Sequence, residues 1–510
     1  MYFLYCLFLL LVCAFLKVLH KFWWIPSRIH HHLNSQGIRG PQHKFLYGNG
    51  KEILQMRKEA MESPMELSHD IFSKVHPYFY TCINTYGKKF LIWLGPQPQL
   101  IVTEQDMIKE ILNNKEKSYP KQEVWAYVKK LLGEGSVTSE GEKWTKMRKV
   151  ANIAFHGDIL KRMVPDTISV VEMMLERWKE HEGKEMEVSE EFRLLTSEMI
   201  ARTAFGSNYL EGKNIFDMLT QLAVLISRNA LKFRLPGISK FYKTSDDIES
   251  DKLVKEIHVA ILEVIKKREA KMAGGVIDTL GSDFLGLLLK AHHDADIDSR
   301  ISVQDMVDEC KTMYFAGQET TTSMLAWTVF LLALHTDWQE KARNEVFQIC
   351  GHNHPCSDDI AKLKTMALII NESLRLYPPV LGLDRESASD VRLGGLVLKA
   401  KTWLYIPILA LHSDPKIWGK DVHQFRPDRF SEGVAKATNY NTAAYFPFGI
   451  GPRYCVGFNV ATTEAKFALS MILQRYRFTL SPSYVHSPFQ LMTLKPQHGI
   501  QIILRPLEKQ

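Results

Sequence analysis

The chain has 510 residues, of which 45% are hydrophobic and 24% are charged, an ordinary balance for a folded protein with a large core. Its formal net charge of +7 suits a membrane surface or an acidic protein partner, but is too small to argue for nucleic-acid binding. The seven cysteines are scattered, which excludes a disulfide framework and favours a reducing compartment.

The first predicted element is a membrane anchor over residues 1–21. Its first 16 residues carry no charge, and about 19 apolar residues in a helix rise roughly 28 Å, just enough for a thin bilayer. Lys17 and Lys21 follow the apolar run and nothing basic precedes it, so the positive-inside rule predicts a luminal N-terminus and a cytosolic body. A cleaved secretory signal is the alternative, although the basic start typical of such signals is missing.

The next segment, residues 22–41, predicts a linker, because it contains Pro26 and a stretch with two glycines and a proline. Residues 42–510 would then form the body. Alternating apolar residues predict short strands at 86–94 and 99–102.

Residues 118–136 predict a loop, since they contain one proline and two glycines. A helix follows in which Trp144 and Arg148 share one face at i and i+4, while nearby lysines project elsewhere. Arginine suits a carboxylate ligand because its guanidinium binds two oxygens at once. Taken alone, these two residues favour an ordinary amphipathic helix. Residues 160–295 are helical in pattern and reveal no chemistry.

One unusually long helix is predicted over residues 303–335, about 50 Å in length. Ser302 and Asp305 have the spacing of a capping box at its start, and Thr336 and Gln339 look like the capping box of the next helix.

The middle of that helix contains its only glycine, Gly317, followed closely by Glu319 and Thr320. Glycine inside a helix costs stability relative to alanine, so its presence needs a reason. The simpler interpretation of the polar residues is a cluster of hydroxyls bonded back to helix carbonyls.

Two later segments contain residues that could bind metal or sugar. Cys350, His352, His354 and Cys356 are zinc-ligand types, but zinc sites usually pair ligands across a longer loop, so an exposed loop is the default interpretation. Asn371 begins a glycosylation pattern, which should stay unmodified in a cytosolic body.

The stretch 446–457 carries the strongest signal. Cys455 is surrounded by glycines that allow a tight turn and a close approach to a flat ligand. A helix is predicted directly after it, so backbone N–H groups and the helix dipole would favour a thiolate. A buried free cysteine is the alternative interpretation.

Phe448, Gly451, Arg453, Cys455 and Gly457 fill the pattern Phe-x-x-Gly-x-Arg-x-Cys-x-Gly, which closely resembles the haem-binding loop of the cytochrome P-450 family. The resemblance covers about residues 40–505. It implies a mostly α fold with small β-sheets, in which residues 42–510 form one haem-thiolate domain behind a single transmembrane helix. The segment 446–467 is most similar to the plant clan that oxidises terpenoids, steroids, fatty acids and isoprenoid hormones.

The resemblance also implies roles for individual residues. Cys455 would be the axial thiolate ligand of haem b iron, and Glu319 and Thr320 would be catalytic by delivering protons. Gly317 would leave room for dioxygen on a locally opened helix. The remaining haem contacts would be Trp144, Arg148, Arg385, Phe448, Gly451 and Arg453. A structural charge lattice would consist of Glu372, Arg375 and Arg429. The apolar substrate cavity would be lined by Trp125, Tyr314, Phe315, Val380, Leu381, Leu491 and Met492.

The implied activity is a monooxygenase that inserts one oxygen atom of O2 into a hydrophobic small molecule. NADPH would supply electrons through cytochrome P-450 reductase, which would dock on lysines such as Lys143, Lys146 and Lys149. The enzyme would reside in the endoplasmic reticulum membrane, and no nucleic acid is expected as a partner. A haem-thiolate isomerase or dehydratase, and a haem sensor without catalysis, are the alternatives. The presence of both Glu319 and Thr320 argues against both alternatives, because an isomerase or dehydratase of this kind typically lacks the acid–threonine pair and a sensor would not need it.

Overall fold

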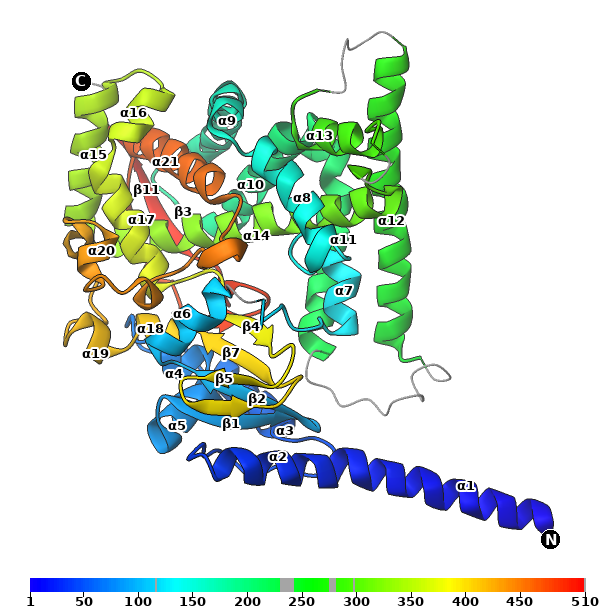
Figure 1. The fold of residues 1–510 in the computed structure, drawn as a ribbon. Helices are drawn as coiled ribbons and strands as arrows, with labels where there is room; N and C mark the ends of the chain where they lie inside the picture. The colour runs from blue at the N-terminus through cyan, green and yellow to red at the C-terminus, as the bar shows by residue number, and fades with distance from the viewer. Residues whose placement is uncertain (115–116, 230–242, 275–280, 297–298, 509–510) are drawn as a thin grey trace.

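The structure is a computed structural model that describes residues 1–114, 117–229, 243–274, 281–296 and 299–508. Most helices gather in one large layer, and the principal sheet lies at the opposite end of the molecule (Figure 1). The N-terminal helix leaves the body on the side of that sheet. This arrangement is the mostly α fold with small sheets that the sequence predicted.

The N-terminal segment is one long helical rod. It consists of α1 (Tyr2–Leu19), the π-helical turn η1 (His20–Trp24) and α2 (Ile25–Asn34). Among the described residues this is the one helix long and apolar enough to cross a membrane, and none of its most apolar window is buried. Phe22 and Leu33, by contrast, are buried against the body, so most of the segment predicted as a linker is helical and partly docked.

The helices of the body are of very different lengths. They are α3 (Gly50–Glu62), α4 (Phe72–Val75), α5 (Pro77–Tyr86), α6 (Gln105–Asn113), α7 (Ala126–Leu132), α8 (Gly141–Ala154), α9 (Gly157–Trp178), α10 (Val188–Phe205), α11 (Tyr209–Asn229), α12 (Ser245–Ala273), α13 (Phe284–His292), α14 (Val303–Leu334), α15 (Thr336–Cys350), α16 (Ser357–Lys362), α17 (Lys364–Leu376), α18 (Ile408–His412), α19 (Pro415–Trp418), α20 (Val434–Ala437) and α21 (Phe458–Arg475). Short 3-10 turns are η2 (Lys179–His181), η5 (Pro427–Phe430), η6 (Thr442–Ala444) and η7 (Gly451–Arg453).

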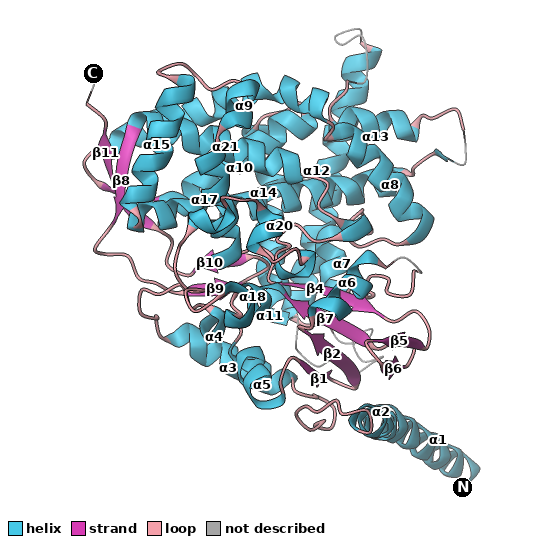
Figure 2. Ribbon diagram, turned by 60° about the vertical axis from the view of Figure 1, so that its left-hand side comes forward, coloured by secondary structure: helices cyan, strands magenta, loops and turns pink. Residues whose placement is uncertain are grey.

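The strands form small sheets. They are β1 (Lys89–Leu94), β2 (Gln97–Val102), β3 (Glu185–Glu187), β4 (Gly382–Glu386), β5 (Val391–Leu393), β6 (Leu396–Leu398), β7 (Trp403–Pro407), β8 (Tyr476–Leu480), β9 (Pro488–Gln490), β10 (Leu494–Pro496) and β11 (Gln501–Pro506). The largest sheet has the order β1-β2-β7-β4, with only the β2–β7 pair parallel. A second sheet has the order β3-β11-β8, and β5–β6 and β9–β10 are separate antiparallel pairs (Figure 2).

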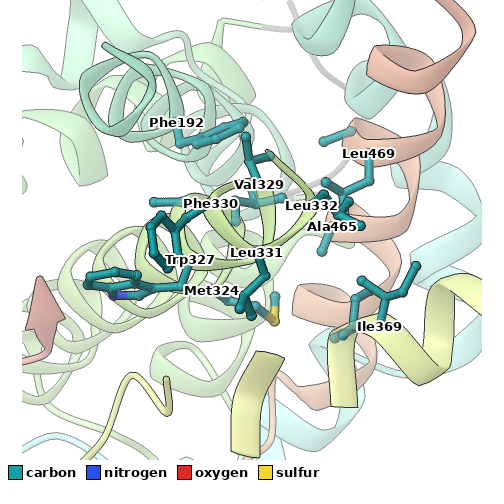
Figure 3. Packing of buried hydrophobic residues seen from close by; sticks show 14 of the residues in the cluster. Phe192, Met324, Trp327, Val329, Phe330, Leu331, Leu332, Ile369, Ala465 and Leu469 are labelled. Atoms are coloured by element: carbon teal, nitrogen blue, oxygen red, sulfur yellow. The ribbon is translucent and has the colours of Figure 1, made fainter. Parts of the chain in front are cut away.

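Helix α14 is the central element of the core. Trp327, Val329, Phe330, Leu331 and Leu332 are each completely buried, and Figure 3 shows them packed among side chains of α10, α17 and α21. Burial on every side explains how a helix of 32 residues is held inside the protein. It begins after Ser302, whose side chain forms the predicted capping box with Asp305.

Two predictions about local structure are wrong. Helix α15 begins after His335 without a side-chain cap, and the amide of Gln339 instead donates to the carbonyls of Leu332 and Phe478 inside the core. The predicted loop 118–136 contains a helical segment, α7, because apolar residues of that stretch such as Leu131 are buried in the core beside α14.

Candidate active site

Cys455 occupies a turn directly before α21. Its backbone N–H donates to the Phe448 carbonyl at 2.9 Å, and this bond closes the loop that begins at Phe448. Burial raises the pKa of the thiol, while the N–H of Gly457 and the charge of Arg148 act in the opposite direction. Cys455 is nevertheless an exposed residue, so its side chain is not sealed in the packed core.

The shape of this loop depends on a glycine. Gly451 has φ +72°, and a Cβ there would lie 2.4 Å from the backbone oxygen of Leu112 at the end of α6. A side chain at position 451 would therefore meet rigid backbone as well as backbone strain. Phe448 holds the other side of the loop, with its ring in edge contact with Phe458 at the start of α21.

Basic side chains from distant parts of the chain converge beside this loop. Arg453 is paired with Glu140 at 2.6 Å, and its guanidinium lies 4.1 Å above the ring of Trp144. Arg148 donates to the backbone carbonyl of Tyr454 at 2.6 Å. Helix α8 therefore brings both residues predicted from it, Trp144 and Arg148, to the cysteine loop.

Arg385, on β4, completes the predicted basic set. Its side chain is buried, and burial together with repulsion from Arg453 lowers its pKa to about 10. Lys121 belongs to the same group, although no sequence motif pointed to it. Burial, then repulsion by Arg385 and Arg453, lowers the pKa of Lys121 to about 7.

This cluster is deficient in negative charge. Within the part of the chain that the structure describes, the guanidinium groups of Arg148 and Arg385 have no carboxylate partner within ion-pair distance; their hydrogen bonds go to Asn152 and to backbone carbonyls. Buried cations are expensive unless they are paired. The residues present therefore fit a ligand that carries two carboxylates and lies next to the Cys455 sulfur. Haem, with its two propionates, is such a ligand.

The middle of α14 differs from the expectation in two respects. The helix is continuous through residues 316–320, and the Thr320 hydroxyl donates to the Ala316 carbonyl at 2.7 Å, so it is not locally opened. A Cβ at Gly317 would lie 2.4 Å from Cδ1 of Ile200 in α10. The prediction that Gly317 leaves room for dioxygen is therefore wrong: this glycine lets α10 and α14 approach each other. The small residue on the face of Thr320 is Ala316, one turn earlier.

Glu319 is buried and ion-paired. Its Oε1 accepts a hydrogen bond from the Thr493 hydroxyl at 2.9 Å and lies 2.8 Å from Nζ of Lys495. Neither partner was evident from the sequence, because they lie more than 170 residues away along the chain.

The three residues of the predicted charge lattice are in contact. Arg375 binds Glu372 through two hydrogen bonds of 2.7 Å, and Nε of Arg429 lies 3.5 Å from the same carboxylate. The first pair is completely buried.

The predicted cavity residues divide into two groups. Trp125, Leu491 and Met492 line a cavity of about 900 Å³ that extends to Phe22 at the base of the N-terminal helix. Tyr314 does not: it is fully buried, stacked on Phe205 at 3.9 Å between ring centroids.

The other three predicted wall residues also lie outside that lining. Leu381 is buried in the main core, and Phe315 is buried near Tyr314. Val380 is half-buried beside the sheet. The prediction is wrong for Tyr314, because a helix buried on every side gives no sequence signal for which face meets a cavity, and it is wrong for Leu381, which is buried in the main core just before β4.

The ligand-type side chains of the possible zinc segment, residues 350–356, do not gather into one group in the structure. No group of three or more His, Cys, Asp or Glu ligands exists among the described residues. Cys350 is buried and Cys356 is exposed.

Comparison with known proteins identifies the family. The family model described as Cytochrome P450 matches residues 65–504. Cytochrome P450 CYP749A22 of Panax ginseng is 56% identical over 504 residues, which cover 98% of this chain and 96% of that protein. Cytochrome P450 734A1 of Arabidopsis thaliana is 40% identical over 507 residues, which cover 98% of this chain and 96% of that protein. Cytochrome P450 CYP72A616 of Paris polyphylla is 40% identical over 495 residues, which cover 95% of each chain. The chain belongs to the cytochrome P450 family, as a monooxygenase whose relatives are plant proteins.

Proposed function

We propose that Cys455 is the axial thiolate ligand of haem b, and that the enzyme inserts one oxygen atom of O2 into a hydrophobic small molecule of terpenoid, steroid or fatty-acid-like character. The observation that carries this proposal is the exposed Cys455 side chain beside Arg148 and Arg385, whose guanidinium groups have no carboxylate within ion-pair distance among the described residues. Thiolate-ligated haem, when bound, supplies O2 activation, because the thiolate pushes electron density toward O–O cleavage.

The residues around the cysteine loop would bind haem or hold the loop in shape. Arg148, Arg385 and Arg453 would bind the two haem carboxylates, and Lys121 would add a fourth cation to the same site. Trp144 keeps Arg453 in place through the contact of ring and guanidinium. Gly451 keeps the loop close to α6, which fixes the direction of the sulfur.

On the other side of the site, Thr320 and Glu319 would handle protons. The Thr320 hydroxyl gives its own hydrogen to the Ala316 carbonyl, which leaves its lone pairs free to accept one from water or from a ligand. Glu319 is the acidic side chain next to it and can exchange protons with solvent when its contacts open.

The cavity supports the substrate class. Its volume of about 900 Å³ is in the range of sites for drug-sized molecules, and Trp125, Leu491 and Met492 offer apolar contact. Because it extends to Phe22, next to the N-terminal helix, a membrane-dissolved substrate could enter from the lipid side.

For the electron supply we propose NADPH with cytochrome P-450 reductase as the partner. Of the three lysines suggested as a docking surface, Lys143 already pairs with Asp305 at 2.6 Å and with Glu134 at 3.5 Å. Lys149 is exposed at the surface of α8 and is better suited to an acidic partner.

The decisive experiment for this function is O2 uptake by the purified protein with NADPH and reductase. We expect uptake by the natural protein and by Cys350→Ala, a control that removes a different cysteine. Cys455→Ser should reduce uptake to background. Equal uptake by Cys455→Ser would contradict the proposal.

We also propose residence in the endoplasmic reticulum membrane, with one span and a cytosolic body. Lys17 and Lys21 directly after the apolar run support this orientation. Protease added to sealed microsomes should then digest nearly the whole chain. A protected body, or sugar on Asn371, would reverse the orientation.

A further inference from the structure

The carboxylate of Glu319 is fixed by residues from the C-terminal hairpin, not by its own helix. Thr493 and Lys495 both contact Oε1, at 2.9 and 2.8 Å. Glu319 is only 6% exposed, while the Lys495 side chain is 29% exposed, so the ion pair is screened on the lysine side only.

The hairpin is built to present these two side chains together. Thr493 and Lys495 are two positions apart, so in an extended segment they project to the same side. Leu494 between them is fully buried, and its carbonyl accepts bonds from Ser323 Oγ at 2.7 Å and from Trp327 Nε1 at 3.2 Å, both on α14. The backbone of β10 is thereby anchored to the helix that carries Glu319.

The same hairpin also reaches the substrate cavity. Leu491 and Met492, in the turn between β9 and β10, line the cavity of about 900 Å³, and Met492 immediately precedes Thr493. The turn that lines the cavity is therefore continuous along the chain with the residues that bind Glu319.

The contacts determine what Glu319 can do chemically. Both partners donate, and an ionised carboxylate only accepts hydrogen bonds. In this arrangement Glu319 is an acceptor and has no proton to give. To pass a proton toward Thr320 it must first take one up, which requires at least the Lys495 contact to open.

We propose that Thr493 and Lys495 are positioning residues for Glu319, which hold its carboxylate in place until contact of a substrate with Leu491 and Met492 loosens them. This inference rests on the proposed role of Glu319 and Thr320 in proton delivery. Each productive turnover joins one substrate R–H, one O2, two electrons and two protons to give R–OH and one water, so a fault in proton delivery diverts O2 to hydrogen peroxide.

The test compares Lys495→Met with Thr320→Ala in the haem-loaded protein with reductase. The quantity measured is peroxide released per O2 consumed, in the presence of a hydrophobic compound that the natural protein oxidises. We expect the ratio to rise at least about twofold in Lys495→Met, with a larger solvent isotope effect on O2 uptake. Lys495→Arg, which retains the charge, should stay near the natural protein. The control is Lys399→Met, which removes a lysine from an exposed ion pair with Asp390.

A second readout does not involve turnover. Urea unfolding of Glu319→Gln, Lys495→Met and the double variant should reveal a coupling of at least about fivefold in the unfolding equilibrium constant. Additive effects would mean that the two side chains do not interact. An unchanged peroxide ratio in Lys495→Met alongside an increased one in Thr320→Ala would overturn this inference and leave proton delivery intact. An unchanged ratio in Thr320→Ala would instead overturn the proton-delivery role itself.

Discussion

Nε of Arg375 lies 2.7 Å from Oε2 of Glu372, and both side chains have no exposed surface. Arg375 also donates to the carbonyls of His412 and Gln424, and the backbone N–H of Arg426 donates to Glu372. The ion pair therefore joins α17 to two later segments of the chain, on the way to the cysteine loop.

The first prediction concerns this pair. Arg375→Leu should lower the free energy of unfolding by about 3–5 kcal/mol, because the buried Glu372 carboxylate loses its two shortest charged hydrogen bonds and keeps only Arg429 at 3.5 Å and the backbone N–H of Arg426. Urea unfolding measures this. Lys341→Ala is the control, since its pair with Asp337 is exposed and should contribute little. A loss in Arg375→Leu as small as that in Lys341→Ala would contradict the structural role.

The second prediction compares two glycines. Gly395 has φ +83°, and a Cβ added there would meet no heavy atom within 4 Å. Gly451 has φ +72°, and a Cβ added there would lie 2.4 Å from the backbone oxygen of Leu112. Gly395→Ala should cost about 1–2 kcal/mol in unfolding free energy and leave the haem content normal. Gly451→Ala should lower the ratio of bound haem to protein several-fold. Equal haem content in both variants would show that the contact with Leu112 is unimportant.

A third prediction follows from Glu464 on α21. This carboxyl is buried, its Oε1 has no hydrogen-bond partner among the described residues, and burial raises its pKa from 4.5 to about 8. Between these values the folded state holds a proton that the unfolded state has released. The free energy of unfolding should therefore fall as pH rises, by at most about 1.4 kcal/mol per pH unit from this group.

Glu464→Gln removes that proton without changing the size of the side chain. The variant should lose less stability than the natural protein between pH 6 and pH 8, as measured by urea unfolding at both values. Parallel pH dependence in the two proteins would mean that Glu464 is ionised in the folded state.

The sequence was sufficient for features that depend on local pattern. The capping box of Ser302 and Asp305 predicted the start of α14, and the glycine–cysteine loop led to the family. The three members of the charge lattice are in contact, although the sequence argument for them came from resemblance rather than from spacing.

Features that depend on contacts between residues far apart in the chain could not be predicted from local sequence pattern. Lys121 has no motif around it, and its importance comes from Arg385 and Arg453, which are hundreds of residues away. The role of Gly317 was hidden because its neighbour Ile200 belongs to another helix. Tyr314 lies on a helix buried on all sides, and Leu381 is buried just before β4, so pattern alone could not tell core from cavity wall.

A fourth prediction concerns Thr320. Thr320→Ala should retain haem, because its hydroxyl bonds only to the Ala316 carbonyl in this structure. General acid–base assistance is typically worth on the order of a hundredfold, so the variant should consume NADPH while releasing more peroxide and less oxygenated product. The product formed per NADPH consumed is the measurement. Thr322→Ala, which removes a hydroxyl bonded to Gln318 on the same helix, is the matched control and should stay coupled.

The most direct test of the whole account is the absorption spectrum of the ferrous protein with carbon monoxide. A thiolate ligand gives a band position different from that of an imidazole ligand, and Cys455 is the cysteine at the basic cluster. We predict the thiolate position for the natural protein and for Cys350→Ala, the imidazole position for Cys455→His, and no thiolate band for Cys455→Ala. A thiolate band that persists in both Cys455 variants would contradict the account, because another cysteine would then bind the iron.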